Sequence, residues 1–185
     1  MGYQEIINKL DSSSIIYIDE SGVDNNITVD KGYSPKGERF YYPQNAFRSE
    51  RHTMIAALNK NLLLAPFVFT GFTNTAIFKT YIKEVLLPVL IPGKVIIMDN
   101  ASFHKSQEIK DLIESAGCKL LFLPKYSPDL NPIENYWAIL KRKTKTFLLN
   151  AGISFEQAIC SAFEYYCSRN RTYARCKSLD QINIF

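Results

Sequence analysis

The stretch GKVIIMDNASFHKSQEIKDLIESAGCKLLFLP, residues 93–124, decides the fold class. It opens with a short apolar run that ends in Asp99 and Asn100, which is typical of a buried strand. Residues 106–116 space their apolar side chains three and four apart, which predicts a helix that Gly117 ends. Residues 118–124 are again a buried apolar strand. This alternation of strand and helix is typical of α/β proteins.

Upstream of this stretch, the sequence predicts strands first and then a helix. The predicted elements are a strand over residues 14–22, strands over 52–59 and 62–71 joined by a short turn, and a helix over 74–87. Pro66 argues that the second hairpin strand lies at an edge or carries a bulge. Pro88 stops the helix. The polar segment 24–45 between the first two strands is predicted to be a loop with some hairpin character.

Downstream of it, two further helices are predicted, over residues 132–149 and 154–168. Antiparallel strands followed by alternating helices and strands imply a mixed sheet with helices on both faces. We therefore predict a single α/β domain over residues 1–185. Its core covers about 14–149, and residues 150–185 form a C-terminal helical extension.

The composition of the 185 residues, 46% hydrophobic and 22% charged, is that of a globular protein and excludes a disordered chain. No apolar run approaches the roughly 18–20 residues of a membrane span. The N-terminus has no basic segment followed by an apolar one, so we expect a cytoplasmic protein. The four cysteines, Cys118, Cys160, Cys167 and Cys176, lack the spacing of a metal site and are expected to be free thiols.

The net charge of +4 is compatible with a polyanionic partner. Basic residues concentrate in KRKTKT, residues 141–146, and in RNRTYARCK, residues 169–177. A solvated helix face is the alternative interpretation of each run.

Three acidic residues stand where predicted elements begin or end. Asp19 ends the first strand, Asp99 ends the strand of residues 93–100, and Glu134 lies in the first turn of the helix at 132–149. Ligand sites of α/β sheets gather at the carboxyl ends of strands, so these acids are placed to converge. A carboxylate cluster repels itself unless cations occupy it, and its hard oxygen ligands suit Mg²⁺ or Mn²⁺. Two such ions support displacement reactions at phosphodiesters.

Each acid also has a purely local interpretation. Asp19 and Asp99 are residue types that start turns. Asn131, Pro132 and Glu134 fit an N-cap, a first helical proline and the third position of a capping box.

The segments IDESG, PKG, DNASFH and PKYSPDLNPIENYW, taken together, resemble the DDE transposases of the mariner superfamily, in its bacterial insertion-sequence branch. The resemblance runs from about Ile15 to Lys145, and thirty-four residues separate Asp99 from Glu134. By this resemblance, Asp19, Asp99 and Glu134 are the catalytic, metal-binding triad. The long segment around Glu134 is its most specific element.

The resemblance implies an RNase H-like fold and cut-and-paste DNA transposition with two Mg²⁺ or Mn²⁺ ions. Its partners would be double-stranded DNA, as inverted-repeat transposon ends and as target, and a second copy of the chain. The protein would act in the cytoplasm, on the bacterial nucleoid. Tyr33 stands where the family often has Trp. The family's N-terminal helix-turn-helix module is absent before the first strand. The chain would then be a catalytic fragment, a second reading frame that works with a separately encoded helix-turn-helix protein, or a decayed copy.

Other residues receive weaker assignments. Asn100 and His104 are expected to support Asp99 or contact phosphate, or to make ordinary structural hydrogen bonds. On the helix of residues 132–149, Trp137 belongs to a core stripe, whereas the lysines share the side of Glu134. The predicted DNA contacts are Lys36, Lys125, Lys141, Arg142 and Lys145.

The sequence is also compatible with two other functions. An RNase H-like nuclease or resolvase would use the same carboxylates for hydrolysis alone. A catalytically silent DNA-binding remnant of a decayed element would keep the fold without the reaction.

Overall fold

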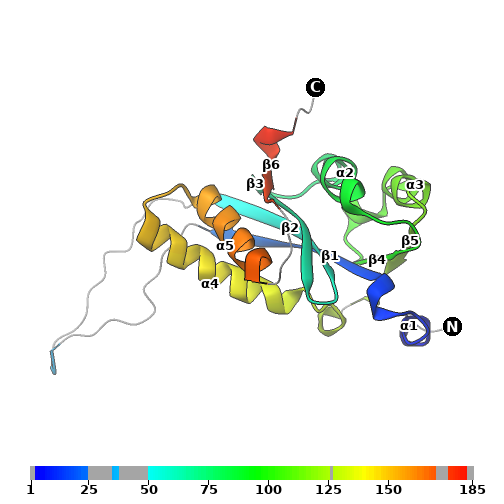
Figure 1. Ribbon diagram of the computed structural model, residues 1–185, viewed down its shortest axis with the longest axis horizontal. Coiled ribbons are helices and arrows are strands. Elements are labelled where there is room, and N and C mark those ends of the chain that lie inside the picture. The colour runs from blue at the N-terminus through cyan, green and yellow to red at the C-terminus, as the bar shows by residue number, and fades with distance from the viewer. Residues whose placement is uncertain (1–2, 25–34, 38–49, 126, 170–174, 183–185) are drawn as a thin grey trace.

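The computed structural model describes residues 3–24, 35–37, 50–125, 127–169 and 175–182. Its strands form one sheet in the order β5-β4-β1-β2-β3-β6 (Figure 1). The strands are β1 (Ile15–Asp24), β2 (Arg51–Asn59), β3 (Leu62–Thr70), β4 (Val95–Met98), β5 (Lys119–Phe122) and β6 (Lys177–Ser178). The segment 24–45, predicted as a loop, falls largely outside the described residues.

The sheet is mixed, as predicted. β1 and β2 pair antiparallel, as do β2 and β3, whereas β4 pairs parallel with both β1 and β5. In the β1–β4 pair Tyr17 lies opposite Ile97. Asp19 and Asp99 each follow two residues later, so the pairing carries both toward the same edge of the sheet at the same level.

The hairpin strand β3 carries the bulge predicted at Pro66. Ile55 of β2 pairs with Phe67, whereas Ala57 pairs with Leu64, so β3 has one extra residue at this point. A proline fits here because the bulge interrupts the ladder to which its missing N–H would have contributed. β3 is not itself an edge strand, because the two-residue strand β6, which the sequence did not predict, pairs with it in parallel.

Helices cover both faces of the sheet, which confirms the α/β prediction. They are α1 (Tyr3–Ile7), α2 (Thr75–Thr80), η2 (Tyr81–Leu86), α3 (Gln107–Ser115), α4 (Glu134–Ala151) and α5 (Phe155–Arg169). Shorter turns are η1 (Ser12–Ser14), η3 (Leu87–Val89), η4 (Ser102–Lys105), η5 (Pro128–Leu130) and η6 (Leu179–Gln181). Figure 1 shows α4 and α5 on one side of the sheet and α2 and α3 on the other.

Each face of the sheet has its own hydrophobic core. Along β2, Met54 and Leu58 pack with α4 and α5, and Ile55 and Ala57 pack with α2, η2 and α3. This alternation explains why the central strands are apolar at nearly every position. The C-terminal helix α5 is part of the core that contains Met54 and Leu58, since its Phe163 is fully buried there.

The helix predicted over residues 74–87 changes its winding. Asn74 caps α2 by accepting a hydrogen bond from the Ile77 backbone N–H at 2.9 Å. After Thr80 the chain winds as a π-helix, η2, and then as the 3₁₀ turn η3, which contains Pro88. The wider turns place Tyr81 in the core, where it is fully buried.

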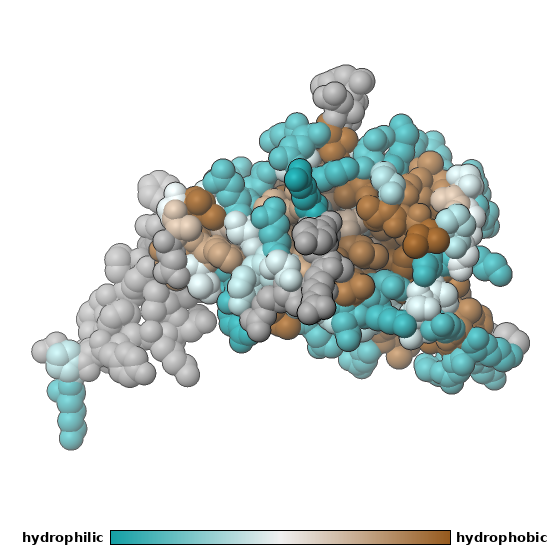
Figure 2. Space-filling view, in the orientation of Figure 1, coloured by the Kyte–Doolittle hydropathy of each residue, from teal (hydrophilic) through white to brown (hydrophobic). Residues whose placement is uncertain are grey.

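Apolar surface also remains on the outside. Figure 2 shows it over the side of the molecule where α2 and α3 lie in Figure 1. Phe72, before α2, and Ile91, after η3, are 71% and 65% exposed. Among the described residues, no helix combines the length and the apolar character that crossing a membrane demands.

Candidate active site

The three acidic residues predicted from the sequence line one open cavity of about 500 Å³. Asp19 comes from β1, Asp99 follows β4, and Glu134 begins α4. The structure thus gathers them from parts of the chain that are far apart in sequence. The cavity is lined by Asp19, Asp99, Asn100, Lys105, Leu123, Pro124, Lys125, Ser127, Asn131 and Glu134.

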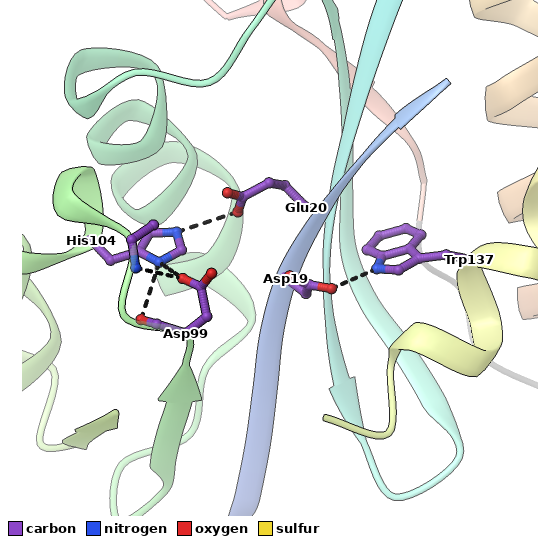
Figure 3. A network of polar contacts seen from close by, with 6 residues as sticks. Asp19, Glu20, Asp99, His104 and Trp137 are labelled. Atoms are coloured by element: carbon purple, nitrogen blue, oxygen red, sulfur yellow. Dashed lines mark hydrogen bonds and ion pairs between the residues drawn. The ribbon is translucent and has the colours of Figure 1, made fainter. Parts of the chain in front are cut away.

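Asp19 is the most buried of the three acids, at 9% exposure. The indole N–H of Trp137 donates a hydrogen bond to its Oδ2 at 2.8 Å (Figure 3). Burial raises the pKa of the Asp19 carboxyl to about 7. The hydrogen bond from Trp137 lowers this pKa, whereas the negative charges of Glu134 and Glu20 raise it further. Asp19 therefore carries a charge that the protein alone stabilises poorly.

Trp137 is thus more than the core residue that the sequence predicted. It is 3% exposed, yet its only polar atom faces the cavity acid. We expect Trp137→Phe to raise the pKa of Asp19 further, because the opposing hydrogen bond is lost, and to cost about 1–3 kcal/mol of stability. Carboxyl-carbon NMR titration measures the first effect, and denaturant unfolding measures the second.

The matched control for this change is Tyr136→Phe. It removes one hydroxyl from the same helix, where the Tyr136 side chain donates to Asn61 away from the cavity. Its Asp19 titration should equal that of the wild type. An unchanged Asp19 pKa in Trp137→Phe would show that the indole does not influence the carboxyl.

Asp99 is held in place by two hydrogen bonds to its Oδ1. His104 Nδ1 lies 2.6 Å from this oxygen, and the Ala101 backbone N–H donates to it at 2.9 Å. The bond from His104 lowers the pKa of the Asp99 carboxyl, with the Ala101 N–H and the charges of His104 and Lys105 acting the same way against burial. Asp99 is therefore charged and oriented before any ligand arrives.

His104 is fully buried, so it does not contact phosphate, which was one of its predicted roles. Its ring packs against those of Phe78 and Phe103, with centroids 4.2 Å and 4.5 Å away. Burial disfavours its charge, but the contacts with Asp99 and Glu20 outweigh that penalty and raise the His104 pKa to about 9. At neutral pH it is therefore an imidazolium in contact with Asp99.

Glu134 is exposed at the start of α4, and the capping-box interpretation of this residue is wrong. Ile133, without any side-chain cap hydrogen bond, occupies the N-cap position. The Asn131 side chain is buried instead, and its Oδ1 has no hydrogen-bond partner among the described residues. Among the described residues Glu134 therefore has no capping role, and it lines the cavity.

Asn100 joins two strand ends. Its side-chain amide donates a hydrogen bond to the Leu123 carbonyl, just beyond β5. This bond ties the chain after β4 to the chain after β5 and so fixes the loop that carries Asp99. Asn100 also lines the cavity.

The predicted basic residues are spread over several elements. Lys125 is exposed and lines the cavity, and so does Lys105, which the sequence analysis passed over. Lys141, Arg142 and Lys145 lie along α4. Lys36 is exposed in the short described segment 35–37 and is not among the cavity residues.

Within the described parts of the chain, no three His, Cys, Asp or Glu side chains already form a metal-binding group. The contacts above supply the reason, since Asp19 is turned toward Trp137 and Asp99 toward His104. Among the described residues, no disulfide bond joins any of the four cysteines.

Fold and cavity together define an α/β protein with an acidic cavity beside the carboxyl ends of β4 and β5. Asp99 follows β4, whereas Asp19 lies in the middle of β1, which runs on to Asp24, so the prediction that Asp19 ends its strand is wrong. The chain belongs to the DDE superfamily endonucleases, whose family model matches residues 14–150. This confirms the predicted resemblance to the DDE transposases.

Individual relatives agree with this family. Over 70 residues, 36% of this chain, it is 41% identical to the Caenorhabditis elegans transposable element Tc3 transposase. The Mos1 transposase paired-end complex with left transposon end has a TM-score of 0.62 at 16% identity and covers 93% of this chain. The Mos1 mariner paired end complex with Mn has a TM-score of 0.61 at 17% identity and covers 90% of it.

These likenesses confirm the RNase H-like mixed sheet predicted for the chain. The chain spans only part of each relative, namely 21% of the Tc3 transposase and 59% and 58% of the two Mos1 chains.

Proposed function

We propose that this chain is the catalytic part of a DNA transposase, which cleaves DNA at transposon ends and joins the freed 3′ hydroxyl to target DNA. Asp19, Asp99 and Glu134 are its catalytic residues. The observation that carries the proposal is the meeting of these three carboxylates at one open cavity, from β1, the end of β4 and the start of α4. The family supports the reaction class.

The cavity has the chemistry to hold divalent cations. All three acids offer hard oxygen ligands, which suit Mg²⁺ or Mn²⁺. The raised pKa of Asp19 marks a buried carboxylate whose charge needs a cation. Asp19, Asp99 and Glu134 would hold two ions. When bound, such ions polarise phosphodiester oxygens and favour in-line displacement.

The chain's own residues hold these ligands and the DNA. Trp137 orders Asp19, and His104 with the Ala101 N–H orders Asp99. A turn of these side chains toward the cavity would complete the ligand set, because the described residues do not yet form one. Lys105 and Lys125 line the same cavity and place positive charge where a phosphodiester would enter. Positioning and charge neutralisation account for most catalysis at phosphorus.

The lysines of α4 that share the side of Glu134 would bind the DNA backbone where it leaves the cavity. Lys141 and Lys145 follow Glu134 by seven and eleven residues along one continuous helix, so all three lie close to one side. They are half-buried, with their charged ends able to reach solvent. Lys143 is engaged elsewhere, with its ammonium 4.3 Å from the ring centre of Tyr165.

We expect Lys141→Ala and Lys145→Ala each to weaken binding of any duplex and to flatten its salt dependence. If each lysine neutralises one phosphate, the slope of log affinity against log salt falls by about 0.9 per substitution. Fluorescence anisotropy with duplexes of two unrelated sequences measures this. Lys119→Ala, at the exposed start of β5, is the matched control. Equal slopes in all variants would remove α4 from the DNA path.

The finer assignments complete the proposal. The substrates are the inverted-repeat ends and a target duplex, and two copies of the chain act on two ends. The reaction takes place on the bacterial nucleoid. The substrates and the pairing follow from the motif resemblance and from transposase relatives, and the location follows from the motif resemblance alone.

The test of the proposal is an assay that scores cutting and joining separately. Labelled duplexes carrying the DNA that flanks this reading frame are incubated with the protein, Mn²⁺ and a plasmid target. The proposal predicts both cut ends and end–plasmid joint products. Cutting without joining would favour an RNase H-like nuclease, and neither product would favour a silent DNA-binding remnant.

A further inference from the structure

We propose that Glu20 is a positioning residue for Asp99 and that it acts through His104. The inference rests on the proposed function, because it assigns Asp99 to the site that binds cations. Nothing in the motif resemblance gave Glu20 a role of its own. The position of Glu20 beside His104 in the structure indicates its role.

Two consecutive residues of β1, Asp19 and Glu20, point to opposite faces of the sheet. Asp19 points toward Trp137 of α4, whereas Glu20 points the other way, toward His104 and Asp99 (Figure 3). The alternation of side chains along a strand produces this division. One dipeptide of the IDESG segment thus provides both a cavity acid and a residue on the opposite face.

Glu20, His104 and Asp99 form a continuous bridge. Glu20 Oε2 lies 3.3 Å from His104 Nε2, and His104 Nδ1 lies 2.6 Å from Asp99 Oδ1. The first contact is an ion pair without hydrogen-bond geometry, since both of its atoms are buried and lack a hydrogen-bond partner among the described residues. The bridge links the middle of β1 to the turn after β4.

The surroundings leave the imidazole little freedom. His104 is 0% exposed and packs against the rings of Phe78 and Phe103. Its two nitrogens therefore stay directed at the two carboxylates. Without Glu20, one nitrogen would face a buried space with no acceptor, which costs free energy and favours a different ring orientation.

Stability of the fold is a weak reason to keep such a bridge. Replacing buried ion pairs by apolar residues of similar volume is often neutral or stabilising. The bridge does, however, set the orientation of Asp99, because both of its side-chain hydrogen bonds fall on Oδ1. The second oxygen is then the one available to the cavity. Partners of this kind that orient metal ligands commonly change affinity by about 10–100-fold when removed.

The test is a double-mutant cycle on Mn²⁺ affinity, measured by isothermal titration calorimetry on the full chain. Glu20→Gln and His104→Gln are each expected to weaken Mn²⁺ binding about tenfold. The double variant should bind no more weakly than His104→Gln alone, because Glu20 acts only through the imidazole. Glu114→Gln, an exposed carboxylate on α3, is the control for the lost charge.

A second readout needs no metal. The Nδ1 proton of His104, bonded to Asp99, should give a downfield NMR signal that Glu20→Gln shifts or broadens and Glu114→Gln leaves unchanged. If the wild-type chain bound no Mn²⁺, the proposed function would fail, and this signal would still decide whether Glu20 positions the pair.

Three results would overturn the inference. The first is a His104 signal that Glu20→Gln leaves unchanged. The second is additive losses of Mn²⁺ affinity in the cycle. The third is failure of both Glu20→Gln and Glu20→Met to fold, which would assign Glu20 to the fold instead.

Discussion

Asp99→Asn and Glu134→Gln are each expected to lower DNA cleavage and joining by about a thousandfold or more while leaving the protein folded. Each change keeps the size of the side chain and removes one negative oxygen ligand. Both residues are at least partly exposed at the cavity, so neither is needed to fill the core. For Glu134→Gln the loss should therefore appear in the reaction and not in the unfolding transition. Asp99→Asn also weakens the contact with the buried His104, so it should lower the stability as well, without preventing folding.

The measurement is the cutting-and-joining assay, run beside thermal unfolding of each variant. Asp129→Asn is the matched control, because Asp129 is an exposed acid of the same sequence motif and does not line the cavity. It should react like the wild type. Substantial joining by either cavity variant would remove that residue from the catalytic set.

Asp19→Asn is expected to abolish the reaction as well and, in addition, to stabilise the metal-free protein above pH 7. The carboxyl pKa is raised from 3.8 to about 7 by burial, so the folded protein binds this proton more tightly than the unfolded chain does. Its contribution to stability is complete below pH 3.8 and is lost as the pH rises through 7. Asparagine removes that loss and can still accept the Trp137 hydrogen bond.

The gain should reach roughly 2–4 kcal/mol, because each unit of pKa shift corresponds to about 1.4 kcal/mol. Urea unfolding in the presence of EDTA, at pH 5 and pH 8, measures it. The wild type should lose stability between these two pH values, and Asp19→Asn should lose less. Added Mn²⁺ should stabilise the wild type and leave the variant unchanged. A variant that is less stable than the wild type at pH 8 would contradict the assigned pKa.

The sequence predicted the layout of the fold well because its signals are local. Apolar runs and three-four spacing identified β1, β4, α3 and α4, and the proline rule located the bulge in β3. The π-helical turn of η2 and the two-residue strand β6 escaped prediction. Both depend on packing against distant residues and have no periodicity of their own.

The residues of the site were likewise predicted only in part from the sequence. The acids were recognisable because short sequence motifs frame all three, and because Asp99 follows a strand and Glu134 begins a helix. The predicted strand end at Asp19 was wrong, since β1 continues to Asp24. The partners of these acids were not, because sequence order does not reveal which side chains meet across the sheet. Trp137 was assigned to the core, and Glu20 received no role. The alternation along β1 was the signal that pointed Asp19 and Glu20 to opposite faces, but the identity of what lay there required coordinates.

The most direct test of the central claim is a crystal of the protein grown with Mn²⁺, examined by anomalous scattering. We expect two Mn²⁺ ions in the cavity, about 3.5–4 Å apart, with oxygens of Asp19, Asp99 and Glu134 as their protein ligands. Strong anomalous peaks elsewhere, together with a cavity that holds no Mn²⁺ at saturating concentration, would contradict this claim.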